Sequence, residues 1–125
     1  MHRQSLRRRA DFQRAYHRGV SAAGRYVAVY AVPNGLSVVR AGYPVGKKYG
    51  GAVQRNRIKR LMRESVRLCA SVPAAGYDLV LVPRRRMTED SPGCDAVLAD
   101  LYSVLRRLDL SDTPHVEGES DDRQG

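Results

Sequence analysis

Residues 54–70 read QRNRIKRLMRESVRLCA and form the most strongly periodic stretch of the chain. Their apolar side chains recur at spacings of three and four, which predicts a helix with one buried stripe, made up of Ile58, Leu61, Met62, Ser65, Val66 and Cys69. Polar and cationic side chains recur with the same period on the other side, at Asn56, Lys59, Arg60, Arg63 and Arg67. We expect the stripe to face a sheet and the cationic row to be free to follow a phosphate backbone.

A basic, glycine-rich segment leads into this helix. Residues 44–53 read PVGKKYGGAV, and glycines there let a backbone approach phosphate groups close to a helix N-terminus with its partial positive charge. The segment is not a nucleoside triphosphate loop, which needs glycine, four residues and then Gly-Lys-Ser/Thr. The alternative is a plain glycine turn before a solvated helix. A solvated face normally mixes both signs of charge, however, and residues 47–67 hold eight bases against the single acid Glu64.

The N-terminal part of the chain predicts a helix and a strand that carry aromatic side chains. Residues 10–19 predict a short helix with an acid in its first turn and a glycine stop, in which Phe12 and Tyr16 share a face. Residues 25–32 predict a β-strand that includes Tyr30. These three aromatic rings could stack on the bases of a single strand, although core packing is the alternative for each of them taken singly.

Two more strands complete the predicted sheet. Residues 36–45 predict the return strand of a hairpin, because the turn Pro-Asn-Gly at residues 33–35 directly follows the strand at residues 25–32. Gly42 and Pro44 weaken the end of this strand and indicate a bulge or a split. Residues 77–82, YDLVLV, are nearly all apolar, which is typical of a central strand.

The last predicted helix closes the core. It runs from Pro92 to Leu108 with Ser91 as its cap, after a basic turn, PRRR, at residues 83–86. The element order is therefore helix, two or three strands, helix, strand and helix. This order predicts an α+β two-layer sandwich without an internal repeat.

The charge of the chain favours a polyanionic partner. The 125 residues carry 22 Lys and Arg against 13 Asp and Glu, a net charge of +9. Residues 109–125 have a net charge of −5, so the rest of the chain carries +14. We expect a single domain over residues 1–110 and a disordered acidic tail over residues 111–125. The tail could act as an autoinhibitory mimic of nucleic acid or simply as a solubilising segment, and the sequence favours neither.

Several classes of protein do not fit the sequence. No apolar run approaches the length of a membrane span, and residues 1–9 lack the hydrophobic stretch of a secretory signal, so we expect a cytoplasmic protein. Cys69 and Cys94 have no second pair and predict neither a zinc site nor a disulfide framework. The three histidines are scattered and no Gly-x-Ser-x-Gly motif occurs, so we expect no catalytic and no metal-binding residue in the chain.

Residues 47–64 nevertheless resemble a known family. The pattern Lys-Lys-x-Gly-x-Ala-Val-x-Arg-Asn-Arg-x-Lys-Arg-x-x-Arg-Glu begins at Lys47 and is similar to the signature of the protein subunit of bacterial ribonuclease P. The segment Asp-Phe-Gln-x-x-Tyr-x-x-Gly that begins at Asp11 resembles the first helix of that family. Together with the element order, the resemblance covers residues 6–108.

The resemblance implies a ribonucleoprotein that removes the 5′ leader from precursor tRNA by endonucleolytic cleavage. In this family the RNA subunit is the catalyst and uses Mg²⁺, while the protein binds RNA and holds no cofactor by itself. The implied partners are the catalytic RNA and the leader of precursor tRNA, with no membrane and no required protein partner. The implied fold is a mixed four-stranded sheet with three helices in the order α-β-β-β-α-β-α. It includes a left-handed β-α-β crossover, where general rules alone predict a right-handed one.

The resemblance also assigns residues to two binding surfaces. The catalytic RNA would contact Lys47, Lys48, Arg55, Asn56, Arg57, Lys59, Arg60, Arg63 and Arg67. The single-stranded leader would lie in a cleft lined by Phe12, Tyr16, Ala28, Tyr30, Asn56, Lys59, Arg60 and Arg63. Two positions depart from the family pattern: Gly46 replaces a common serine, which removes a hydroxyl that could bind phosphate, and Tyr16 replaces a common phenylalanine.

Two rival functions remain open at this point. A structural RNA-binding protein, such as a ribosomal component, would have the same charge and general fold, and the signature that begins at Lys47 argues against it. A stand-alone nuclease would need an acid–base or metal site, and the acids of the folded part form no motif of that kind.

Overall fold

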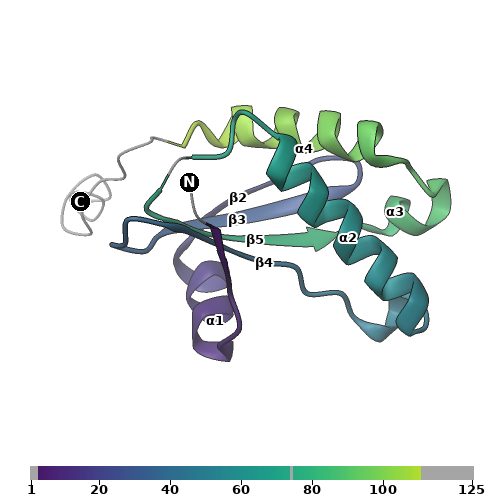
Figure 1. Cartoon of the computed structure of the whole chain (residues 1–125), viewed down its shortest axis with the longest axis horizontal. Helices are drawn as coiled ribbons and strands as arrows, with labels where there is room; N and C mark the ends of the chain where they lie inside the picture. Colours follow the sequence, from purple (N-terminus) through teal and green to yellow (C-terminus); the bar gives the residue numbers. More distant parts are fainter. Residues whose placement is uncertain (1–2, 74, 111–125) are drawn as a thin grey trace.

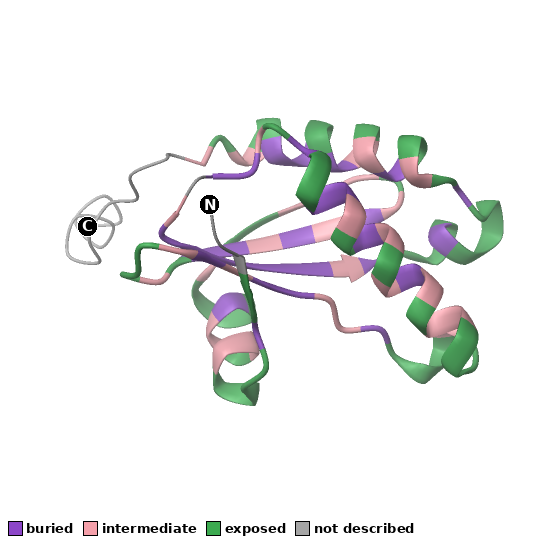
Figure 2. Ribbon diagram, viewed as in Figure 1, coloured by how far each residue is buried: buried purple, intermediate pink, exposed green. Residues whose placement is uncertain are grey.

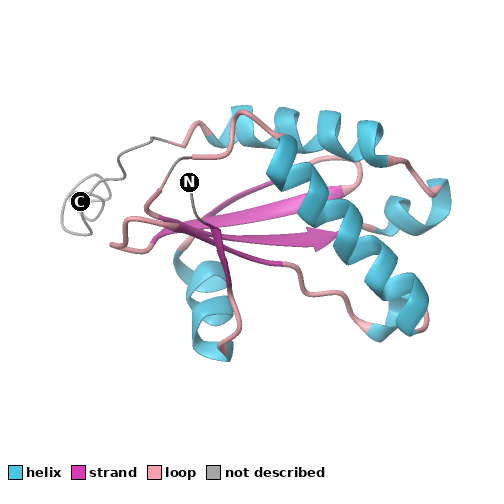
Figure 3. Ribbon diagram, in the orientation of Figure 1, coloured by secondary structure: helices cyan, strands magenta, loops and turns pink. Residues whose placement is uncertain are grey.

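The computed structural model of the chain describes residues 3–73 and 75–110. Its elements are β1 (Arg3–Ser5), α1 (Arg9–Arg18), β2 (Val20–Ala23), β3 (Val27–Pro33), β4 (Val39–Gly42), the 3-10 helix η1 (Lys47–Tyr49), α2 (Ala52–Leu68), β5 (Tyr77–Pro83), α3 (Arg85–Asp90) and α4 (Cys94–Leu108). Figure 3 shows the α+β architecture that the sequence predicts. The predicted acidic tail, residues 111–125, lies outside the described residues.

The sheet has five strands in the order β1-β4-β5-β3-β2. β5 is central, as predicted; it pairs in parallel with β4 and antiparallel with β3. The predicted hairpin between residues 25–32 and 36–45 is therefore wrong, because β5 lies between the two strands. β5 is buried along nearly its whole length, so its apolar side chains need cover on both faces. At the expected turn, the backbone N–H of Asn34 instead donates a hydrogen bond to the carbonyl oxygen of Gly76, the residue before β5.

The hairpin that does form joins β2 to β3 through residues 24–26. The turn has no Asn-Gly or Asp-Gly pair that would mark it in the sequence. The carboxylate of Asp100, on α4, accepts the backbone N–H groups of Arg25, Tyr26 and Val27 at 2.8, 2.8 and 3.1 Å. A side chain more than seventy residues away therefore holds this turn, and no local pattern could reveal it.

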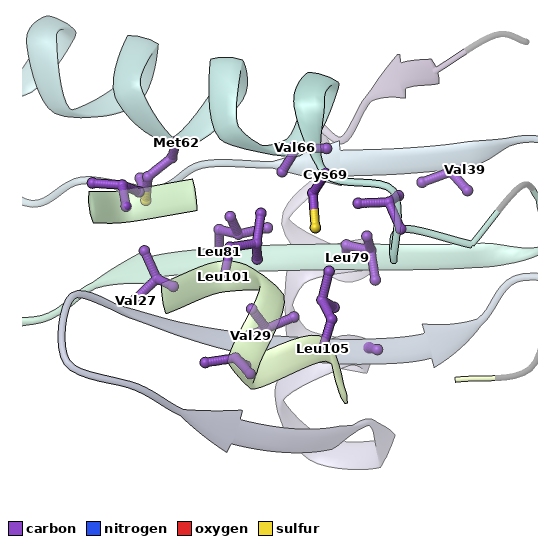
Figure 4. Packing of buried hydrophobic residues seen from close by; sticks show 14 of the residues in the cluster. Val27, Val29, Val39, Met62, Val66, Cys69, Leu79, Leu81, Leu101 and Leu105 are labelled. Atoms are coloured by element: carbon purple, nitrogen blue, oxygen red, sulfur yellow. The ribbon is translucent and has the colours of Figure 1, made fainter. Parts of the chain in front are cut away.

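Two helices cover one face of the sheet and α1 covers the other (Figure 1). On the first face eighteen buried residues form the main core, and Figure 4 shows 14 residues of this cluster packed between the sheet and the helices. Ile58, Met62 and Val66 supply the part from α2, so the predicted stripe of that helix faces the sheet as expected. On the second face, the described part of the chain has a smaller buried cluster of Leu6, Ala15, Val32 and Val80, and Figure 2 shows little purple on α1.

The connection from β4 to β5 runs through α2. Figure 1 shows α2 in front of these parallel strands, with β5 above β4 and both running from left to right. The crossover is therefore left-handed, as the resemblance implies and against the general preference.

Three details differ from the sequence-based expectation. The sheet has five strands rather than four, because the short polar segment Arg3–Ser5 pairs with β4 as an edge strand. The predicted basic turn is in part the helix α3, which the buried side chain of Met87 anchors in the main core. Ser91 does not cap the last helix: it adopts a left-handed conformation (φ 45°) after α3, and α4 begins after Gly93.

Candidate nucleic-acid interface

The cations of α2 spread over its solvent side. Asn56, Arg60, Arg63 and Arg67 are exposed, and Arg55, Arg57 and Lys59 are half-buried. The guanidinium of Arg63 lies 5.4 Å from the centre of the Tyr43 ring, in the segment that follows β4. The side of α2 that bears Arg63 therefore faces this segment, whereas Leu68 packs toward α4 on the other side of the helix.

The predicted lysines lie in η1, next to the beginning of α2. Lys47 and Lys48 are exposed, and the Lys48 ammonium lies 5.4 Å from the Tyr49 ring centre. The Tyr49 hydroxyl donates a 2.6 Å hydrogen bond to the carbonyl oxygen of Pro83 at the end of β5. Gly50 follows with φ 126°, a conformation that side chains rarely adopt. The basic segment is thus fixed to the end of the sheet at which α2 starts.

Acidic side chains neutralise little of this surface. Within residues 3–73 and 75–110, Arg67 alone among the predicted RNA-binding cations has an ion pair, with Glu64 three residues earlier on the same helix. The hydrogen bond from Arg67 is the main cause that holds the pKa of Glu64 below its usual value. The described residues include four more acids with ion pairs to partners outside α2 and η1, namely Asp11, Asp78, Glu89 and Asp90. The surface therefore presents uncompensated positive charge.

A second surface lies between α1 and the opposite face of the sheet. The rings of Tyr16 on α1 and Tyr30 on β3 meet edge to face, with centroids 5.0 Å apart and an interplanar angle of 85°. Burial, and then the neighbouring Tyr30, raises the pKa of Tyr16, so its hydroxyl stays neutral at physiological pH. Phe12 packs over Gly42: a Cβ at this glycine would lie 2.6 Å from the ring. The first turns of α1 thus place two aromatic rings along the sheet.

The sheet surface beside α1 includes residues beyond the predicted ones. Ala28 and Tyr30 point to the α1 face of β3, and Val82 of β5, the partner of Ala28 in the sheet register, packs in the same cluster. In a half-buried strand, alternation of polar and apolar side chains would have shown which face Val82 belongs to. β5 is apolar on both faces, so this signal is missing. Gly42 was expected to mark a bulge or a split in the strand, and the structure shows it as the contact that receives Phe12.

The predicted leader-binding residues fall into two groups. Phe12, Tyr16, Ala28 and Tyr30 come together on the α1 face, while Asn56, Lys59, Arg60 and Arg63 lie on α2, whose buried stripe packs on the other face. Figure 1 shows α1 and the first turns of α2 at opposite ends of the lower side of the sheet, with the segment after β4 between them. The structure therefore places the two groups on helices and strands that belong to opposite faces of the sheet.

Other chemistry finds little support in the described residues. Among residues 3–73 and 75–110, no group of three or more His, Cys, Asp and Glu side chains is placed to hold a metal ion. None of the helices in the same ranges combines the length and the apolar character of a membrane span.

Known proteins share this sequence and this fold. The family model described as Ribonuclease P matches residues 1–109. The ribonuclease P protein component of Caldanaerobacter subterraneus subsp. tengcongensis is 48% identical over 114 residues, which cover 90% of each protein. The solved structure of the RNase P protein from Thermotoga maritima superimposes with a TM-score of 0.73 at 33% identity and covers 83% of this chain and 96% of that one. A Staphylococcus aureus RNase P protein gives a TM-score of 0.71 at 32% identity, over 83% and 94% of the two chains.

The model match spans most of the chain, and the two solved structures have the same mixed sheet architecture. The chain therefore belongs to the family of ribonuclease P protein components, the accessory protein subunits of the ribonucleoprotein endoribonuclease that processes the 5′ end of tRNA with an RNA partner.

Proposed function

We propose that the chain binds the catalytic RNA of ribonuclease P through α2 and η1, and holds the single-stranded 5′ leader of precursor tRNA in the groove between α1 and the sheet. The observations that carry the proposal are the Tyr16–Tyr30 pair, whose rings are half-exposed on the α1 face of the sheet, and the cations of α2 and η1. Among the described residues, Arg67 is the one of these cations that has an ion pair. Aromatic faces bind unstacked bases of any sequence, and neighbouring cations bind the phosphates that link them. A surface that binds leaders of variable sequence has to accept any base in this way.

We assign the residues of each surface as follows. The contacts with the catalytic RNA come from Lys47, Lys48, Arg55, Asn56, Arg57, Lys59, Arg60, Arg63 and Arg67. The groove for the leader consists of Phe12, Tyr16, Ala28 and Tyr30, with Val82 added to its floor, and Asn56, Lys59, Arg60 and Arg63 border the path by which the strand enters.

The proposed contribution of the chain is electrostatic and positional. Two polyanions, the catalytic RNA and the precursor tRNA, repel each other, and the uncompensated cations of α2 and η1 reduce that repulsion. Mg²⁺ held with the RNA subunit supplies the hydrolysis, and every step assigned to this chain is a binding step. Because mature tRNA has no leader, contacts in the groove favour substrate over product. Differential binding of this kind promotes product release.

We further propose that residues 1–110 act as one RNA-binding domain, that the protein works in the cytoplasm, and that it needs no protein partner. The pairing of β5, from the second half of the chain, with β3 and β4, from the first half, supports a single folding unit.

The function is tested by cleavage of 5′-labelled precursor tRNA at low Mg²⁺. Reactions contain the protein alone, a bacterial ribonuclease P RNA alone, or both. We expect cleavage at the mature 5′ end only with both components. Cleavage by the protein alone would reveal a catalytic site in the chain. Failure of the protein to assist the RNA would contradict the proposal and favour a structural RNA-binding role.

A further inference from the structure

Charged as well as apolar contacts hold α1 to the sheet. Ala15 is the single fully buried residue of α1, and the cluster on this face has four buried residues against eighteen in the main core. Beside Ala15 lies a carboxylate with no exposed surface, Asp78 of β5. A buried carboxylate needs partners for all its lone pairs, so the surrounding donors are constrained in position.

Four hydrogen bonds occupy the two oxygens of Asp78. Arg40 of β4 donates two of them, from Nε to Oδ1 and from Nη2 to Oδ2, both at 2.7 Å. Asn34 donates Nδ2 to Oδ1 at 2.9 Å, and Arg14 of α1 donates Nη2 to Oδ2 at 2.6 Å. Asp11, one turn before Arg14, adds weaker ion pairs to Arg14 and Arg40 at 3.5 and 3.4 Å. The Arg14 bond is thus the direct link from α1 to the buried carboxylate.

The position of Arg14 on α1 couples this link to the groove. Arg14 lies between Phe12 and Tyr16 in the chain, and on a helix it projects from a different side than those two rings. The hydrogen bond from Arg14 to Asp78 fixes the rotation of α1 about its own axis. That rotation in turn places Phe12 over Gly42 and Tyr16 beside Tyr30. The contact at Gly42 leaves no room for a Cβ, so the Phe12 ring tolerates little displacement toward the sheet.

We propose that Asp78 is a positioning residue for the leader-binding groove, acting through Arg14 and supported by Arg40. It is fully buried and does not touch the leader itself. This inference rests on the proposed function, because it assumes that the groove between α1 and the sheet holds the leader. It assigns a role to an acid that belongs to no recognisable sequence motif.

Two substitutions that change the net charge in opposite directions distinguish a positioning role of Asp78 from a general effect of charge on RNA binding. Asp78→Asn makes the protein more positive by one unit, and Arg14→Met makes it less positive by one. If only charge mattered, the first would tighten RNA binding and the second would weaken it. Positioning predicts that both weaken binding of leader-containing precursor to the reconstituted holoenzyme about tenfold, since a displaced ring no longer stacks fully on a base. Affinity for mature tRNA and for the catalytic RNA should not change.

Conservative and distant variants complete the design. Arg14→Lys keeps one cationic donor that can reach Asp78, so it should restore most of the leader affinity. Asp90→Asn removes a carboxylate that pairs with Arg25 and Arg86 away from the groove, and it should bind the leader as the unmodified protein does. The salt dependence of binding should keep its slope in Arg14→Met, because a shallower slope would mean that Arg14 itself contacts a phosphate.

A structural measurement on the free protein tests the positioning role of Asp78 independently of leader binding. The nuclear Overhauser effects between the Tyr16 and Tyr30 rings should weaken in Asp78→Asn and Arg14→Met and return in Arg14→Lys. If the unmodified holoenzyme did not distinguish precursor from mature tRNA, the proposed function would fail, while the ring-to-ring effects would still test the positioning. Unchanged ring-to-ring effects, tighter binding by Asp78→Asn, or equal losses for precursor and mature tRNA would each overturn the inference. Should Asp78→Asn not fold, Arg14→Met carries the test, because Asp78 there keeps Arg40 and Asn34.

Discussion

Replacing Tyr16 by alanine tests the aromatic groove most directly. The side chain is 38% exposed and its main ring contact is the one with Tyr30, at 5.0 Å. Loss of an edge-to-face pair costs about 0.5–1.5 kcal/mol of folding stability, which most domains tolerate. Loss of a stacked base costs about 1–3 kcal/mol of binding, or roughly 5- to 150-fold in affinity. The expected phenotype is therefore a folded protein with a specific loss of leader binding.

The assay compares two ligands of the reconstituted holoenzyme. Dissociation constants are measured for precursor tRNA with a single-stranded leader and for the same tRNA without it. Tyr16→Ala should weaken the first and leave the second unchanged, while Tyr16→Phe should preserve both because the ring remains. Tyr102→Ala is the matched control: Tyr102 is 45% exposed and carries the Arg106 guanidinium 5.7 Å from its ring centre, but it lies on α4, over the other face of the sheet.

Two results would refute the reasoning about Tyr16. Equal losses for both tRNAs would place its effect in folding or in binding of the tRNA body rather than the leader. A loss of the same size in Tyr102→Ala would show that any exposed tyrosine of this basic protein contributes to RNA binding. In either case the groove would lose its assignment, while the family membership of the chain would stand.

The remaining predictions concern charge and stability. Arg60→Ala should make the salt dependence of catalytic-RNA binding shallower by about 0.7–0.9 for each phosphate that the side chain neutralises, and an unchanged slope would show that Arg60 is merely solvated. Burial favours a higher pKa for Asp78, but the hydrogen bonds from Arg40 and Asn34 outweigh it and hold that pKa below its usual value. The stabilisation from Asp78 is therefore present above its unfolded pKa and is lost as the pH falls through the lower folded pKa. Urea titrations between about pH 3 and 7 should show a smaller acid-induced loss in Asp78→Asn than in the unmodified protein. Asp109 ends α4 with φ 52°, so Asp109→Gly should raise the free energy of unfolding by about 1 kcal/mol, as measured by thermal or urea unfolding, and a decrease would contradict the strain argument.

The helices α1, α2 and α4 and the central strand could be predicted because their signals are local. The spacing of Ile58, Met62 and Val66 requires a helix with one buried side, and the continuous apolar run of β5 requires cover on both faces. The order of strands in the sheet cannot be predicted in this way, because it depends on contacts between segments that are distant in the sequence. The Pro-Asn-Gly turn at residues 33–35 indicated a hairpin, yet β5 gains more burial between β3 and β4 than at an edge, and it separates them.

In the candidate site, too, local features could be predicted from the sequence and long-range contacts could not. Phe12, Tyr16 and Tyr30 could be singled out because aromatic residues near a cationic segment indicate nucleic-acid binding, and the structure brings Tyr16 and Tyr30 into contact. Nothing in the sequence around Asp78 indicates that this acid joins β5 to α1. Its partners Arg40, Asn34 and Arg14 are 38, 44 and 64 residues away, and a buried polar network of such separation has no sequence spacing to reveal it.

The unequal cores of the two faces give the two surfaces different mechanical properties. The helix α2 packs into a cluster of eighteen buried residues, so its cations are displayed from a rigid support, as suits contacts with a large folded RNA. The helix α1 rests on four buried residues and a network of charges, which resists rotation but allows local opening at lower cost. The proposed groove, built in this way, would admit leaders of different sequence while its aromatic rings keep a defined spacing. In our proposal the same construction makes the groove depend on Asp78, so loss of this buried carboxylate should weaken binding of the leader but spare binding of the catalytic RNA.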